Sequence, residues 1–389
     1  MIVKNGLVHD AVSEKPYEAD IVIKNGVIAS ICRDGQAASS EEGEPVIDAS
    51  GLHVYPGLVD AHSHVGLCDF GMGKEGSDLN ETSDIISPQL RGIDSFYPQD
   101  KAVSIALEHG ITTVCTGPGS LNVLGGTFTA IKMYGNCADK MTVKKEAAMK
   151  CAFGENPIMN HADAVNSTRM HTAGLLREAL LRARDYMRRK ENAEKESANP
   201  PAFDVKYEAM IPLLKRDMPL KVHAHRADDI CTAIRVAKEF DLKLTLEHCT
   251  EGRFIVDELV EAGCPVAVGP LISGSSKKEL ANQSIETPRI LSEAGLRVSI
   301  ITDAPVVPQK YLALTAMLAV NEGGMNPFYA LQAITINAAR HIGIEERVGS
   351  IECGKDGDLV LADGDILVNK TKIKAVVVNG DVVVDRFGN

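Results

Sequence analysis

The chain contains no tryptophan, and aromatic residues make up only 4% of its 389 residues. Proteins that stack sugars or single-stranded nucleic acid use aromatic side chains for this purpose, so such ligands are less attractive here. Basic residues are also too few for the chain to bind a polyanion. Lysine and arginine total 41 against 53 aspartate and glutamate, which gives a formal charge of −12. We therefore expect neither nucleic acid nor an anionic membrane as a partner.

Signals for export and membrane insertion are missing as well. The first residues, MIVKNGLVHD, contain no apolar segment of a signal peptide, and no apolar run approaches the roughly 18 residues that span a bilayer. The nine cysteines are odd in number and form no C-x-x-C pair. We expect reduced thiols in a soluble, cytoplasmic protein. The motifs G-x-S-x-G, G-x-x-x-x-G-K-[ST] and G-x-G-x-x-G after a strand are also absent.

Hydrophobic patterning divides the chain into two strand-rich ends and a long α/β centre. Short β-branched runs separated by Asn-Gly and Asp-Gly turns occur at both ends, which predicts one small β-sandwich domain from residues 1–55 and 345–389. Residues 56–344 alternate apolar runs with helical stretches, including a strong helix at 174–194, and this predicts a (β/α)8 barrel of the TIM type with parallel strands. We place the eight barrel strands at 57–64, 111–117, 127–134, 147–154, 220–225, 243–249, 265–269 and 297–303.

Polar residues recur at the predicted carboxyl ends of these strands, where barrel enzymes keep their active sites. His62 and His64 are two residues apart on the first strand and so point to the same side. His223 and His225 end the fifth strand, His248 ends the run Glu247-His248 on the sixth, and Asp303 ends the eighth. Imidazoles with a carboxylate favour a borderline divalent cation such as Zn²⁺.

The segments GLVDAHSH, LKVHAH, LTLEHC and IITDAP resemble, in this order, the metal-binding strands of the amidohydrolase superfamily. The similarity extends over nearly the whole chain and is greatest to its imidazolonepropionase-like and prolidase-related group. It implies one or two divalent metal ions bound by His62, His64, His223, His248 and Asp303. It also implies that Asp303 is the catalytic residue that transfers the proton.

The resemblance leaves two ligands open. MKCAFGENP is similar to a strand of related dipeptidases whose lysine is carboxylated, which favours Lys150 as the ligand that bridges two metals, with Glu155 as the alternative. His223 is favoured over His225 as the ligand from the fifth strand. His225 and Arg226 are then candidates for binding an oxyanion or carboxylate of the substrate.

The predicted reaction is hydrolysis of a carbon–nitrogen bond in a non-standard amide, cyclic amide or dipeptide-like small molecule. A deaminase is the alternative, although the position three residues after the ligand histidine, where nucleobase deaminases have glutamate, is Arg226, or Asp228 if His225 is the ligand. A non-catalytic barrel protein that assembles with partners is a third reading, but such proteins lack some of the ligands present here. We expect substrate selection in loops 66–98, 117–126 and 155–171, where His161, Arg169 and His171 lie, and we expect a homo-oligomer.

Overall fold

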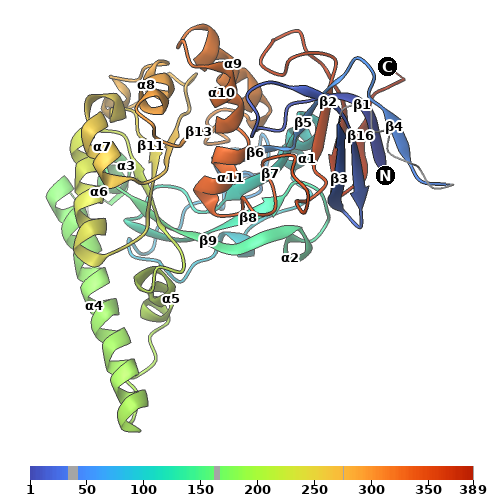
Figure 1. The fold of residues 1–389 in the computed structure, drawn as a ribbon. Helices are drawn as coiled ribbons and strands as arrows, with labels where there is room; N and C mark the ends of the chain where they lie inside the picture. The colour runs from blue at the N-terminus through green and yellow to red at the C-terminus, as the bar shows by residue number, and fades with distance from the viewer. Residues whose placement is uncertain (34–42, 162–166, 275, 389) are drawn as a thin grey trace.

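The computed structural model describes residues 1–33, 43–161, 167–274 and 276–388 and contains two large β-sheets (Figure 1). Residues 162–166 of the predicted loop 155–171 therefore lie outside the described part of the chain. One sheet lies at the centre of the molecule and the other is formed by the two ends of the chain. Both termini lie on this second sheet.

The central sheet contains eight strands in the order β13-β12-β11-β10-β9-β8-β7-β6. All eight overlap the predicted barrel strands. Their bounds are β6 Leu58–Ser63, β7 Ile111–Thr116, β8 Leu124–Lys132, β9 Thr142–Ala152, β10 Leu220–Ala224, β11 Leu244–His248, β12 Val266–Val268 and β13 Val298–Ile300.

The direction of the third strand differs from the prediction. We expected eight parallel strands, but β8 runs antiparallel to both β7 and β9. Only residues 117–123 join β7 to β8, and a parallel crossover needs a dozen or more residues. The chain therefore turns back directly at the end of β7, and Leu124 at the start of β8 lies at the same end of the sheet as Thr116.

The sheet curves into a nearly closed barrel. Its two outer strands, β13 and β6, are joined by contacts just beyond the ladder: the Asp303 backbone N–H donates to the His62 carbonyl at 3.2 Å and that of His64 donates to the Ala304 carbonyl at 2.8 Å. The hydroxyl of Thr302 also donates to the buried carboxylate of Asp60 at 2.5 Å. These contacts hold the ends of β6 and β13 together, which brings His62, His64 and Asp303 side by side.

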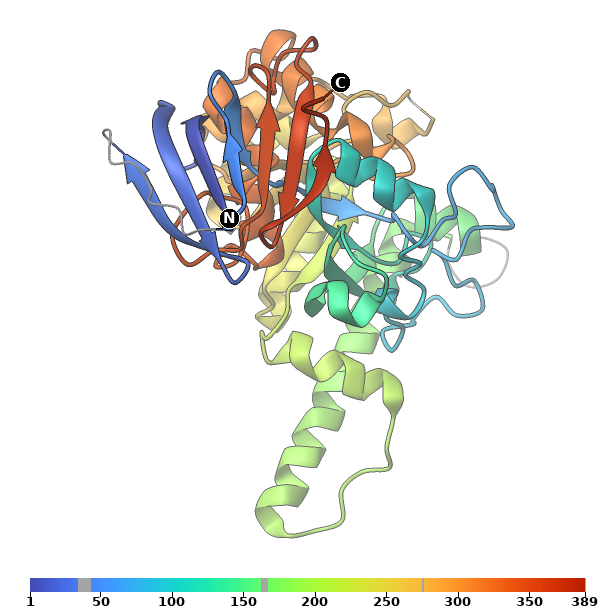
Figure 2. The ribbon, with the colours of Figure 1, turned by 90° about the vertical axis from the view of Figure 1, so that its right-hand side faces the viewer.

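Helices cover the outside of the barrel, and two of them project from it. Helices α4 and α5 form a hairpin that extends away from both sheets (Figures 1 and 2). Helix α4 contains the predicted helix 174–194 and begins with the Thr168 side chain accepting from the His171 backbone N–H. The helices are α1 Lys101–Glu108, α2 Ala138–Met141, α3 Glu155–His161, α4 Arg169–Glu196, α5 Val205–Leu214, α6 Ala227–Phe240, α7 Val256–Ala262, α8 Thr287–Glu293, α9 Leu312–Asn321, α10 Pro327–Ala333 and α11 Ile336–Ile342, with short 3-10 turns η1 Gly92–Asp94, η2 Gly252–Phe254, η3 Lys278–Leu280 and η4 Gln309–Tyr311.

The second sheet joins strands from the two ends of the chain. Its main path is β16-β15-β14-β5-β1-β2-β3, with β4 paired to β1. Strand β5 from the first part of the chain pairs with β14 from the last part. The strands are β1 Ile2–Val8, β2 Tyr17–Lys24, β3 Val27–Arg33, β4 Val46–Asp48, β5 His53–Pro56, β14 Leu359–Ala362, β15 Ile373–Val378 and β16 Asp381–Asp385.

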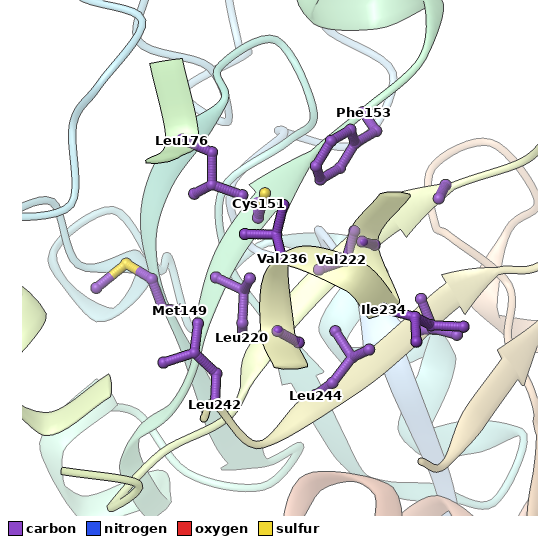
Figure 3. Packing of buried hydrophobic residues seen from close by; sticks show 14 of the residues in the cluster. Met149, Cys151, Phe153, Leu176, Leu220, Val222, Ile234, Val236, Leu242 and Leu244 are labelled. Carbon is purple, nitrogen blue, oxygen red and sulfur yellow. The ribbon is translucent and has the colours of Figure 1, made fainter. Parts of the chain in front are cut away.

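The largest apolar cluster packs the barrel strands against their outer helices. Figure 3 shows Met149 and Cys151 of β9 beside Leu220 of β10, with Leu176 of α4 and Val236 of α6 over them. All five side chains are fully buried. Because this packing is rigid, it holds the carboxyl ends of β9, β10 and β11 in a constant relative position.

Candidate metal centre

Six predicted residues converge at the carboxyl ends of the barrel strands. His62 lies on β6, His223 on β10 and His248 on β11, and His64, His225 and Asp303 come within three residues after strands. Two sets of ligand atoms lie within 4.8 Å of one another, and His248 belongs to both. The sets are His62, His248 and Asp303, and His223, His225 and His248. This geometry could hold one or two divalent metal ions.

The first set surrounds the carboxylate of Asp303. Its Oδ1 atom lies 3.2 Å from Nε2 of His64 and 3.5 Å from Nε2 of His62. The other ring nitrogen of each histidine has a partner of its own. Nδ1 of His64 lies 2.7 Å from the carbonyl of Gly117, and Nδ1 of His62 lies 3.0 Å from the carboxylate of Glu247. Because carbonyl and carboxylate oxygens only accept, both Nδ1 atoms must carry the proton.

The second set is made of three imidazoles that are held by uncharged groups. Nδ1 of His248 donates to the Gly269 carbonyl at 2.8 Å, and its buried Nε2 has no hydrogen-bond partner. Nδ1 of His225 lies 2.8 Å from the Thr250 hydroxyl and Nδ1 of His223 lies 3.0 Å from that of Ser120. The Nε2 atoms are therefore available to face one another, which is the usual arrangement of zinc-binding histidines.

Burial keeps these histidines neutral. It lowers the pKa of His62, His223 and His225 well below the usual value, and it lowers the pKa of His248 to about 4. Asp303 is ionised: burial opposes its charge, but His248, which gains a proton only in acid, and the hydrogen bond with His64 hold the pKa of this carboxyl far below its usual range.

A metal ion fits this arrangement for a simple reason. His248 is neutral and donates from Nδ1, so its Nε2 presents only a lone pair, and this buried nitrogen has no hydrogen-bond partner. His248 lies within 4.8 Å of the ligand atoms of His62 and Asp303, and within the same distance of those of His223 and His225. Lone pairs gathered in a buried place repel one another unless a cation lies among them.

Two of the candidate ligands have an unusual backbone conformation. His248 has a φ of 72° and Asp303 has a φ of 53°, the left-handed region that residues other than glycine seldom adopt. Each such residue costs about 1–3 kcal/mol and persists only when its surroundings enforce it. Strain of this kind clusters at functional sites, and here it directs the ends of β11 and β13 toward the cluster.

The two candidates for a bridging ligand lie in different environments. The Lys150 side chain is fully buried on β9, and its Nζ lies 3.4 Å from Nε2 of His62. Burial lowers the pKa of Lys150 to about 8, against the opposing influence of Asp303 and Glu247. Glu155 begins helix α3, is only half-buried, and bonds through its backbone N–H to the Glu279 carboxylate at 2.9 Å.

A buried charge network lies beneath His62 that sequence reasoning did not assign. The Glu247 carboxylate accepts from Lys221 Nζ at 2.8 Å and from His341 Nε2 at 2.7 Å as well as from His62. These partners hold the pKa of Glu247 well below its usual range although burial alone would raise it. One pattern in the sequence could have indicated this network. Lys221 alternates with His223 on one strand, and Thr245 alternates with Glu247 on the neighbouring strand.

The remaining predicted residues belong to neither set of candidate ligands. Arg226 pairs with the exposed carboxylate of Asp228 at 3.0 Å, and Arg169 pairs with Asp229 at 3.0 Å. His161 is buried and bonds to Asn122 at 3.0 Å, whereas His171 is exposed on α4. Substrate contact by Arg226, His161, Arg169 and His171 stays a prediction.

An apolar cavity of about 460 Å³ lies beside the Asp303 side of the cluster. It extends from His64 and Ala304 to the predicted loop 66–98. Its apolar walls come from Val65, Phe70, Leu79, Ile105, Pro305, Pro308 and Tyr311. A group of moderate size could therefore be bound next to the candidate metal ligands.

Comparison with known proteins assigns this arrangement to a family. The model of the amidohydrolase family matches residues 53–383. The chain belongs to the amidohydrolase family. A solved amidohydrolase from Thermotoga maritima is 37% identical, superimposes with a TM-score of 0.95, and is covered over its full length by 99% of this chain.

Two curated relatives are more distant. Amidohydrolase tasK of Hapsidospora irregularis is 27% identical over 376 residues, which are 90% of this chain but only 38% of that protein. An imidazolonepropionase of Thermoplasma volcanium is 26% identical over 404 residues, covering 95% of this chain and 91% of the relative. The family and these relatives support a hydrolytic enzyme that acts on carbon–nitrogen bonds.

Proposed function

We propose that the chain is a metal-dependent hydrolase that cleaves the carbon–nitrogen bond of a small amide, cyclic amide or dipeptide-like substrate. One observation carries this proposal: the buried Nε2 of neutral His248 has no hydrogen-bond partner, and His248 belongs to two groups of candidate ligands at the mouth of the barrel. A divalent metal bound there would polarise a carbonyl and lower the pKa of water from about 15.7 towards 7.

The metal-binding residues proposed are His62, His64, Lys150, His223, His248 and Asp303. Nitrogen donors with one or two anionic oxygens suit zinc. Lys150 would contribute as a carbamate, formed when its neutral amine adds carbon dioxide and releases a proton. Burial favours the neutral amine, which is the nucleophile in this reaction.

Asp303 is the residue best placed to transfer a proton. Its side chain is 15% exposed, whereas that of His62 is fully buried. A carboxylate that is ionised and reachable from the mouth can take a proton from the attacking water. It can then deliver this proton to the leaving nitrogen.

The apolar cavity supports a substrate with an apolar group beside the scissile bond. Because its wall includes His64 and Ala304, a group bound there would place the adjoining carbonyl near Asp303. The name of the imidazolonepropionase relative fits a cyclic amide, and the cavity volume fits a ligand of amino-acid or dipeptide size.

Metal analysis and a substrate screen test this proposal together. Protein purified without added metal should contain zinc or a similar divalent ion, and removal of the ion should abolish hydrolysis until it is restored. N-acyl amino acids, dipeptides and cyclic amides with graded apolar side chains form the panel. Full activity of metal-free protein, or failure to bind any divalent ion, would refute the proposal.

Three further expectations, on domain organisation, assembly and location, are also proposals. We infer that the second sheet forms a small β-sandwich domain from 1–55 and 345–389, because one buried apolar cluster contains side chains from β1, β2, β14 and β15. A homo-oligomer is supported by the projecting α4–α5 hairpin, whose loop exposes 77% of Phe203. Light scattering would measure the assembly.

A cytoplasmic location rests on the sequence alone. Separately, none of the helices in the described residues has the length and apolar character of a membrane span.

A further inference from the structure

Glu279 is a buried carboxylate next to the three-histidine set and belongs to none of the predicted metal-binding strands. It lies in the turn η3, between β12 and α8, and its side chain is fully buried. Its Oε1 atom is 3.9 Å from Nε2 of His223 and 3.8 Å from Nε2 of His225. A carboxylate in this place faces the same two nitrogen atoms that face His248.

The two oxygens of Glu279 have different surroundings. Oε2 accepts from the Glu155 backbone N–H at 2.9 Å, which orients the group. Oε1 points to the histidines, and its only positively charged neighbour within 4 Å among the described residues is Lys277, at 3.5 Å and 28% exposed. One oxygen is therefore held by the backbone, whereas the other has only a long hydrogen bond from a partly exposed lysine and can accept a ligand.

The local backbone allows this close approach. Gly154 follows strand β9 with a φ of 84°, and a β-carbon added there would come within 2.4 Å of Glu279 Oε2. Any other residue would displace the carboxylate or strain the turn. The end of β9 thus leaves space for Glu279 at the barrel mouth.

The distances from Glu279 to His223 and His225 agree with a shared metal ion. Zinc binds nitrogen and oxygen at about 2.0–2.2 Å, so two atoms on the same zinc are at most about 4.4 Å apart. Both separations from Oε1 lie within this limit. The Asn156 amide, 3.5 Å from His223 Nε2, is the other polar group at this edge.

We propose that Glu279 is a ligand of the metal ion bound by His223, His225 and His248. This inference rests on the proposed function, since it requires a metal at this set. It adds an anionic ligand from the loop after the seventh barrel strand, and it makes His225 a ligand beside His223. The charge of Glu279 would balance a divalent ion on the side of the centre where the imidazoles are neutral.

The test compares Glu279→Gln with Glu286→Gln, a matched change at an exposed glutamate seven residues away that pairs with Arg289. Metal content is measured after equilibration with zinc, and affinity is measured by competition with a chromophoric chelator. Glu279→Gln should bind one zinc at least about tenfold more weakly, with the other site and Glu286→Gln unchanged. Cobalt substitution should show an altered visible spectrum for Glu279→Gln alone.

Unaltered zinc affinity and an unaltered cobalt spectrum in folded Glu279→Gln would overturn the inference. If that variant does not fold, the wild-type protein decides: anomalous diffraction at the zinc edge should place an ion within about 2.3 Å of Glu279. An ion on His223 and His248 that lies beyond 3.5 Å from both carboxylate oxygens would also overturn it. Wild-type protein that binds no metal would instead refute the proposed function itself.

Discussion

The two halves of the candidate metal centre both contain histidines but are supported in different ways. Around His62 the neighbouring groups are charged, with Glu247, Lys221 and Lys150 packed together below the barrel mouth and Asp303 above them. Around the His223 set they are a serine hydroxyl, a threonine hydroxyl and a backbone carbonyl, held at 2.8–3.0 Å.

Because of this difference, we expect the two halves to be held in place by different interactions. The charged half contains its own positive and negative groups, so its geometry is maintained by ion pairs deep in the barrel. The neutral half has three imidazoles with lone pairs directed inward, so we expect its order to depend more on a bound ion. Metal removal should therefore disturb the His223 set more than the His62 set, which hydrogen exchange of β6 and β10 can compare.

The largest effect is expected from Asp303→Asn. The amide keeps the shape of the side chain but cannot accept the proton, and general acid–base groups contribute about 10²–10⁴-fold. We expect kcat/KM on a cleaved amide to fall by at least about a hundredfold. Asp185→Asn on the exposed face of α4 is the control, and a variant of Asp303 that retains a tenth of the activity would remove its assigned role.

Glu247→Gln tests the charged half through stability. Loss of this carboxylate leaves Lys221 buried without its counter-ion, and breaking a buried pair costs about 3–5 kcal/mol. Chemical denaturation should show this loss in the metal-free protein. Glu261→Gln, which removes only the exposed partner of Lys238, should change the free energy of unfolding by less than about 1 kcal/mol.

Because Lys150 is buried in the charged half, the free energy of unfolding should depend on pH. Its pKa is about 8 in the folded protein and 10.5 when exposed. Between these values the unfolded chain binds the proton and the folded chain does not, so stability rises with pH in this window. Lys150→Met lacks the buried amine and should be more stable than wild type at pH 7. In metal-free protein without carbon dioxide, this difference in the free energy of unfolding should shrink by up to about 3 kcal/mol from pH 7 to pH 10.5.

The matched control for that experiment is Lys74→Met at an exposed loop position. Its stability difference from wild type should stay constant with pH. If the difference in free energy of unfolding between Lys150→Met and wild type is also independent of pH, the charged form of the buried amine is already stabilised by its neighbours.

The smallest effect is expected in the neutral half. Thr250→Val removes the hydroxyl beside His225 Nδ1, and one neutral hydrogen bond contributes about 1 kcal/mol. Zinc affinity at the His223 set should fall a few-fold while the His62 set is unaffected. Thr232→Val, whose hydroxyl bonds to Asp228 and Arg235 of the same helix α6, should leave both unchanged. An equal loss at both sets would show that the halves are not independent.

Much of this architecture is encoded locally. Runs such as ITTVCTG and PVAVG are short and rich in β-branched residues, which favours buried strands, and all eight barrel strands overlap the predicted positions. The spacing of His62 and His64 likewise sets their shared direction, because side chains alternate along a strand. The sequence by itself thus determined which strands exist and which residues stand at their ends.

Tertiary structure decided what those residues meet. Glu247 joins His62 from 185 residues away and His341 from 94 residues away, and Glu279 reaches His223 only because the barrel brings their loops together. The antiparallel direction of β8 also depended on how the chain turns after Thr116. Such contacts follow from closure of the barrel, and no local periodicity records them.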